Sequence, residues 1–217
     1  KWIESVAYVT SLEKAPELEA LADAIIDDVE KNQHEDGYFN IYFTVVQPEA
    51  RWSCRDWHEL YCAGHLMEAA CAYYDVTGRD RFLRAMEKYA DYIKKVFVDE
   101  NSASFVTPGH EEIELALYRM YKTTGKKKFL ELCRFFLEHR GLPENNEMNI
   151  GGAAHYAQNH LPIREQKEAF GHSVRAVYLY SAMADLALET GDGELKETCK
   201  ALFENITGKK MYVTGGI

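Results

Sequence analysis

One arrangement of apolar and polar positions repeats three times along the chain. Each repeat begins at a histidine, continues as an almost wholly apolar helical stretch, and ends at Thr-Gly before an amphipathic helix. The three histidines are His58, His110 and His172. A helix that is apolar around most of its surface must be buried, so the first helix of each repeat is predicted to be internal and the second external. This pattern is typical of an array of helical hairpins.

The inner helices are predicted over residues 59–74, 110–121 and 176–188, and the outer helices over 80–97, 126–139 and the residues after Thr190-Gly191. Residues 17–33 form another amphipathic pattern, with Pro16 suited to its first turn, and residues 2–11 are its expected partner. No strand pattern is convincing, although Met211–Thr214 could form a short extended piece. The sequence therefore predicts an all-α protein.

Four such hairpins would make roughly two-thirds of a closed (α/α)6 toroid. We expect one incomplete toroid domain over residues 1–217 and no second domain. Its open ends would expose apolar faces, which favours covering by another copy in a homo-oligomer or by further polypeptide. Residues 141–171 are rich in Gly, Asn, His and Pro, and a loop of this length in a compact domain is usually functional.

Composition narrows the class of partner. The chain has 217 residues, 47% of them hydrophobic, and a formal net charge of −10, which argues against nucleic acid and fits a small neutral ligand. No apolar run reaches the roughly 20 residues that span a bilayer. The first residues lack the apolar core of a signal peptide and contain no Met, so the native N-terminus is expected to lie upstream. Five scattered cysteines favour free thiols in a reducing, cytoplasmic compartment.

Two groups of residues could carry chemistry, and each has a structural alternative. His58, Cys62 and His65 share one helical face and could contribute to a zinc site, with Cys54 extending the stripe, or they could simply pack. Glu111, Glu112 and Glu114 could supply paired carboxylates for acid/base catalysis, or they could be acidic residues favoured in a first helical turn.

The three histidines are more informative together than singly, since hairpins of one array place the starts of their inner helices on the same rim. A neutral imidazole donates one hydrogen bond and accepts another, which suits sugar hydroxyls. Tyr38 and Trp57 could provide stacking faces for a sugar ring.

Several strings carry a family resemblance. These are DGYFNIYF (36–43), WHELYCAGH (57–65), GHEEIELAL (109–117), HLPIREQKEAFGHSVRA (160–176) and KKMYVTGGI (209–217). In this order the chain resembles the bacterial glycoside hydrolase family 127 of β-L-arabinofuranosidases, over essentially its whole length. The resemblance implies an (α/α)6 toroid that hydrolyses terminal β-L-arabinofuranosides with retention. It also implies that His58, His110 and His172 bind the sugar.

For mechanism, the resemblance implies a zinc-bound cysteine nucleophile, a glutamate acid/base, and zinc held by one Glu and three Cys. All of these lie beyond Thr-Gly-Gly-Ile in the family, and this sequence ends at Ile217. We therefore expect no catalytic residue and no metal site in this chain, with zinc belonging to the full-length protein.

Two other functions remain open from the residues alone. Another α/α-toroid sugar enzyme, such as an unsaturated-uronide hydrolase or a sugar epimerase, would use Glu111, Glu112 or Asp56 for catalysis. A non-catalytic helical-repeat scaffold would bind no sugar, and replacing its histidines would not change ligand affinity.

Overall fold

The computed structural model describes residues 1–145 and 154–217. Its α-helices are α1 (Trp2–Leu12), α2 (Pro16–Asn32), α3 (Tyr42–Val45), α4 (Glu59–Thr77), α5 (Arg81–Lys94), α6 (Ile113–Thr124), α7 (Lys127–His139), α8 (Ser173–Thr190) and α9 (Gly193–Asn205). No strand occurs in these two ranges, so the all-α prediction is confirmed. No helix of the described residues is long and apolar enough to cross a membrane.

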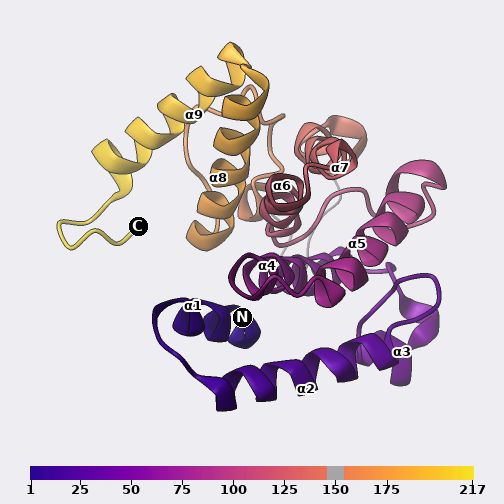
Figure 1. Ribbon diagram of the computed structural model, residues 1–217. Coiled ribbons are helices and arrows are strands. Elements are labelled where there is room, and N and C mark those ends of the chain that lie inside the picture. The colour runs from indigo at the N-terminus through magenta and orange to yellow at the C-terminus, as the bar shows by residue number, and fades with distance from the viewer. Residues whose placement is uncertain (146–153) are drawn as a thin grey trace.

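The long helices pair into four hairpins, as the sequence pattern predicts. Helices α1, α4, α6 and α8 pack side by side in that order and form the inner layer, while α2, α5, α7 and α9 each pack on their own inner partner (Figure 1). The inner helices follow an arc that is open between α8 and α1, which is the expected incomplete α/α array. Buried apolar side chains from Ile3 to Leu202 form one core cluster.

The predicted Thr-Gly turns close three of the hairpins in the same way. Gly78, Gly125 and Gly191 have φ angles of 70°, 71° and 69°, a left-handed conformation that glycine adopts without steric cost. In each turn the preceding threonine donates its hydroxyl to the carbonyl four residues earlier. The short turn holds each outer helix antiparallel to its inner partner, and so the inner helices begin at one rim.

Two predicted boundaries differ from the structure. Helix α6 begins at Ile113 rather than at His110, because residues 107–112 follow an irregular path along the rim. Residues 211–214 do not form the expected extended piece. They lead into a turn at residues 213 and 214, where the Gly215 N–H donates to the Tyr212 carbonyl and the Tyr212 N–H donates to the Gly216 carbonyl. The predicted functional loop over 141–171 contains two short helical turns, Pro143–Asn145 and Ala154–Ala157, and its residues 146–153 lie outside the described part.

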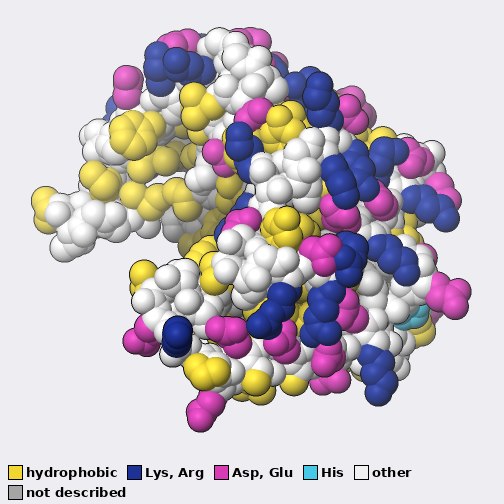
Figure 2. All heavy atoms as spheres, viewed as in Figure 1, with side chains coloured by type: hydrophobic (Ala, Val, Ile, Leu, Met, Phe, Trp, Pro, Cys, Tyr) yellow, Lys and Arg dark blue, Asp and Glu magenta, His cyan; other side chains and the backbone are white. Residues whose placement is uncertain are grey.

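Apolar side chains remain exposed near the open end of the arc. They include Val174 and Val177 on α8, Phe203 on α9, and Tyr212 and Val213 in the C-terminal segment. Figure 2 shows hydrophobic side chains gathered between α9 and that segment, whereas charged side chains are spread over the face that α4 and α5 present. These faces agree with the expected apolar edges, and homo-oligomerisation through them stays a prediction.

Candidate functional site

The structure brings the three predicted histidines into one row, which we call the histidine row (His58, His110 and His172). The ring centroids of His58 and His110 are 5.9 Å apart, and those of His110 and His172 are 6.2 Å apart. His58 and His172 are the residues immediately before α4 and α8, and His110 lies three residues before α6. The arrangement results from the hairpin array, because adjacent inner helices begin at the same rim.

His58 reaches this place through a left-handed backbone conformation, with φ 58° and ψ 19°. Such a conformation is uncommon for a residue with a Cβ atom and is concentrated at functional sites. The side chain of His58 is exposed, whereas His110 and His172 are half-buried. The row therefore extends from solvent at His58 into a partly enclosed region at His110.

Tyrosines that the sequence analysis did not single out surround the row. The ring of Tyr61 lies 4.5 Å from His110 and 5.6 Å from His58, and the ring of Tyr178 lies 5.9 Å from His110. Tyr156 packs edge-on against His172 at 5.6 Å. Tyr61 could have been found from its spacing, since it follows His58 by three residues on an inner helix. Tyr156 has no such signal, because it comes from the long loop.

The environment favours a neutral His110. Burial lowers the pKa of His110 to about 4, although the backbone contact of its Nδ1 with the Glu111 carbonyl oxygen at 2.9 Å acts in the opposite direction. A neutral imidazole whose Nδ1 is committed to that carbonyl keeps Nε2 as an acceptor. This is the hydrogen-bonding state that suits a hydroxyl group.

The three acidic residues beside His110 are not an exposed catalytic pair. Glu111 is fully buried with its Oε1 2.9 Å from Arg140, and Glu114 is buried with its Oε1 3.1 Å from the same guanidinium. Glu112 is buried against His65, with 2.9 Å between Oε1 and Nδ1. Burial raises the pKa values of Glu111 and Glu112 to about 8. Because α6 starts at Ile113, only Glu114 lies in a first helical turn, so the helix-dipole explanation of Glu111 and Glu112 is wrong.

The residues considered for zinc do not fit a metal site. No group of three or more His, Cys, Asp and Glu side chains in residues 1–145 and 154–217 is arranged to hold a metal ion. His65 contacts Glu112 and the Tyr61 ring, and Cys62 is exposed. All five cysteines are free, and burial raises the pKa values of Cys71 to about 12 and of Cys199 to about 11. A thiolate ligand would need the opposite shift.

Of the two aromatic residues expected to stack on sugar, one is buried and the other is exposed. Tyr38 is fully buried and donates its hydroxyl to Glu59 over 2.5 Å, so it belongs to the core. Trp57 is 41% exposed and stacks on Phe43 with 5.4 Å between ring centroids. Trp57 and Phe43 line a pocket of about 480 Å³, and Asp56 and His58 line the same pocket. Trp57 therefore remains a candidate contact beside the histidine row.

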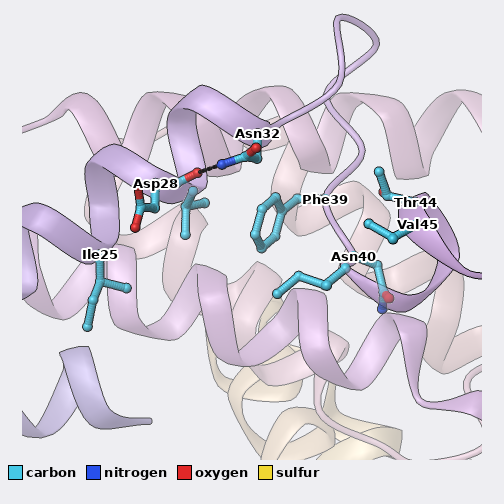
Figure 3. A pocket seen from close by; sticks show the side chains of 9 residues that line it. Ile25, Asp28, Asn32, Phe39, Asn40, Thr44 and Val45 are labelled. Atoms are coloured by element: carbon cyan, nitrogen blue, oxygen red, sulfur yellow. Dashed lines mark hydrogen bonds between the residues drawn. The ribbon is translucent and has the colours of Figure 1, made fainter.

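A second pocket, of about 380 Å³, lies between α2 and the segment that leads into α3. Its lining is mostly apolar, with Ile25, Val29, Phe39, Ile41 and Val45, together with Asp28 and Asn32 near one edge (Figure 3). None of the three histidines lines it. Asn40 and Thr44 also line this pocket.

The structure is thus an array of helical hairpins with histidines along one rim. Residues 1–217 match the family described as β-L-arabinofuranosidase, GH127 catalytic domain, and the chain belongs to this family. A non-reducing end β-L-arabinofuranosidase of Bifidobacterium longum subsp. longum is 36% identical over 236 residues, which cover 100% of this chain and 36% of that protein.

Solved structures are similar in fold as well as in sequence. The crystal structure of a GH127 β-L-arabinofuranosidase from Geobacillus stearothermophilus T6 is 46% identical with a TM-score of 0.93, covering 100% of this chain and 36% of that one. A GH127 β-arabinofuranosidase is 36% identical with a TM-score of 0.87, covering 99% of this chain and 34% of that one. The chain thus spans about a third of the length of these relatives.

Proposed function

We propose that this chain is the sugar-binding part of a retaining β-L-arabinofuranosidase, with the nucleophile, the acid/base and the zinc site supplied by residues outside it. The sugar would be held by His58, His110 and His172. The observation that carries the proposal is the histidine row, in which the His110 ring lies 5.9 Å from the His58 ring and 6.2 Å from the His172 ring, although the three come from different hairpins.

The chemistry of the row supports a neutral carbohydrate. His110 is uncharged at neutral pH, and aromatic rings of Tyr61 and Tyr178 flank it. Sugar rings present hydroxyl groups and apolar C–H faces, which match imidazole nitrogens and aromatic surfaces respectively.

The residues also disfavour the alternative in which Glu111 or Glu112 is catalytic. A catalytic carboxylate must reach the substrate, yet the exposed fractions of Glu111 and Glu112 are 0% and 2%. Glu111 instead contacts Arg140 and Glu112 contacts His65. A purely structural scaffold would not explain the left-handed backbone conformation of His58 or the half-buried, neutral imidazole of His110.

The test is to replace each histidine by alanine in the full-length enzyme and to measure KM and kcat with a synthetic terminal β-L-arabinofuranoside. Loss of one hydrogen bond to the sugar is expected to raise KM between about twofold and tenfold for each of H58A, H110A and H172A. His139→Ala is the matched control, because His139 lies at the end of outer helix α7 and its ring contacts the carbonyl and the ring of Phe135 in the same helix. Unchanged KM values in all three row variants would overturn the proposal.

A further inference from the structure

The segment that carries His110 is held by an unusual set of hydrogen bonds. Three consecutive backbone carbonyls, those of Thr107, Pro108 and Gly109, all accept hydrogen bonds from arginine side chains. These residues are buried, so the carbonyl groups would otherwise lack solvent as a partner. The last of them directly precedes His110.

Three arginines make these contacts, and we call them the arginine clamp (Arg55, Arg140 and Arg175). Arg55 donates from Nε to the Thr107 carbonyl over 2.8 Å and from Nη2 to the Thr107 hydroxyl over 3.1 Å and to the Pro108 carbonyl over 3.3 Å. Arg140 donates to the Pro108 carbonyl over 3.0 Å. Arg175 donates to the Gly109 carbonyl.

The clamp joins the three segments that carry the histidine row. Arg55 precedes His58 by three residues, and Arg175 follows His172 by three residues. The carbonyls that they bind lie beside His110 in the chain. Consequently, the backbone positions of all three histidines are tied to each other through two guanidinium groups, and Arg140 adds a third attachment from the end of α7.

Burying the three guanidinium groups of the clamp carries a free-energy penalty, which argues that they have a role beyond packing. Arg55, Arg140 and Arg175 are 8%, 0% and 7% exposed, and burial of a charged guanidinium carries a desolvation penalty of several kcal/mol. Arg140 contacts the carboxyl groups of Glu111 and Glu114, with oxygen–nitrogen distances of 2.9 and 3.1 Å. Apolar side chains of similar size would stabilise the fold without this desolvation penalty. Hydrogen bonds from a planar guanidinium, in contrast, fix the position of the backbone carbonyls that accept them.

Gly109 shows how closely the clamped segment approaches its neighbour. A Cβ atom at this position would lie 2.6 Å from the Arg55 carbonyl oxygen and 2.9 Å from Oδ1 of Asp56. The segment therefore packs directly on the backbone that leads to His58, without room for even a methyl group.

We propose that Arg55, Arg140 and Arg175 are positioning residues that set the place of His110 between His58 and His172 and thereby determine sugar affinity. The effect on sugar rests on the proposed function above, whereas the effect on the His110 ring does not. The planar guanidinium of an arginine donates hydrogen bonds in fixed directions and so fixes its acceptors in place. The ammonium group of a lysine, on a flexible stem, does not.

The test compares Arg55→Lys and Arg175→Lys with Arg164→Lys in the full-length enzyme. All three changes keep the charge and remove the planar fork. Arg164 is a matched control because it also makes several ion pairs, to Glu138, Asp192 and Glu194, but it lies away from the row. Two readouts are measured: kinetics with a terminal β-L-arabinofuranoside, and modification of His110 by diethyl pyrocarbonate, followed by peptide mass spectrometry with His139 as the internal reference.

Both clamp variants are expected to change the rate of His110 modification relative to His139 and to raise KM about tenfold or more, with kcat within a factor of about three, since small misplacements of a binding group are costly. An unchanged His110 rate in both variants would overturn the proposal, whatever happens to KM. The same change in the Arg164→Lys control would also overturn it, because the effect would then be general loosening. A changed His110 rate with unchanged KM would support the clamp and contradict the sugar-binding role of His110.

Discussion

Burial is the main influence on the protonation of single residues around the histidine row. It lowers the pKa values of His65 and His110 to about 4 from 6.5, and it raises those of Glu111 and Glu112 to about 8 from 4.5. For Glu112 the charge of Glu114 adds to the effect of burial. The histidines and the carboxyl groups therefore contribute to stability in opposite directions as pH changes.

The sign follows from proton binding in the folded and unfolded states. Between pH 4 and 6.5 the unfolded histidines bind more protons than the folded ones, so their contribution to the free energy of unfolding increases with pH and is complete above 6.5. Between pH 4.5 and 8 the folded carboxyl groups bind more protons, so their contribution decreases as pH rises. Between pH 6.5 and 8 the histidine contribution is constant, and only the carboxyl contribution still changes with pH.

We predict that Glu112→Gln makes stability less dependent on pH in this window. A glutamine amide can donate to His65 Nδ1 as a protonated carboxyl group does, and it cannot ionise. The wild-type free energy of unfolding should fall more steeply than that of the variant, by up to about 1.4 kcal/mol per pH unit. Urea unfolding at pH 6.5, 7.2 and 8 measures both slopes. Glu131→Gln, at an exposed position of α7, serves as the control, and equal slopes in wild type and E112Q would contradict the prediction.

At the scale of helices, close approach between α4 and α6 places Glu112 and the residues before it. Gly64 is the residue of α4 that permits this approach, since a Cβ atom there would lie 2.7 Å from Cγ of Glu112 and 3.2 Å from Cα of Ile113. The contact joins two inner helices directly at the start of α6. Its loss would separate two hairpins of the array.

We predict that Gly64→Ala destabilises the protein although alanine is the better helix former by roughly 1 kcal/mol. Overpacking against backbone atoms typically costs about 1–3 kcal/mol, which exceeds the gain in helix propensity. Gly193→Ala in α9 is the matched control, because nothing lies within 4 Å of its Cβ position. Thermal unfolding of both variants measures the difference. A melting temperature for G64A equal to or above that of G193A would show that α4 and α6 can separate without cost.

The elements were largely predictable from the sequence because their signals are local. The Thr-Gly ends of α4, α6 and α8 and the apolar inner faces identified the hairpins, and the shared rim of inner helices placed the histidines in one row. The start of α6 was not predictable, since residues before it are held by Arg55 and Arg175, which are 52 and 66 residues distant from the carbonyls they bind. Burial of Tyr38 was missed for the same reason, because its partner Glu59 comes from another element.

At the scale of the whole molecule, the array is an open arc. The histidine row lies along its inner rim, and apolar side chains are exposed near its open end. The single core cluster agrees with one domain, and the assignment of residues 1–217 to one partial domain stays a prediction. Exposed apolar residues of α8 and α9 lie near the open end of the arc, and the chain covers 36% of the length of its Bifidobacterium relative.

The last prediction concerns the 217-residue chain by itself, which we expect to release no arabinose and to bind no zinc stoichiometrically. A cysteine nucleophile needs a stabilised thiolate, and burial instead raises the pKa values of Cys71, Cys133 and Cys199. The buried Glu111 and Glu112 cannot reach a glycosidic oxygen as acid or base. Arabinose release from a synthetic β-L-arabinofuranoside and metal content after dialysis against zinc measure the two expectations, with the full-length enzyme as the positive control. Turnover by the isolated chain with one bound zinc ion would place the catalytic centre among its own residues. It would contradict the proposal that the nucleophile, the acid/base and the zinc site lie outside this chain.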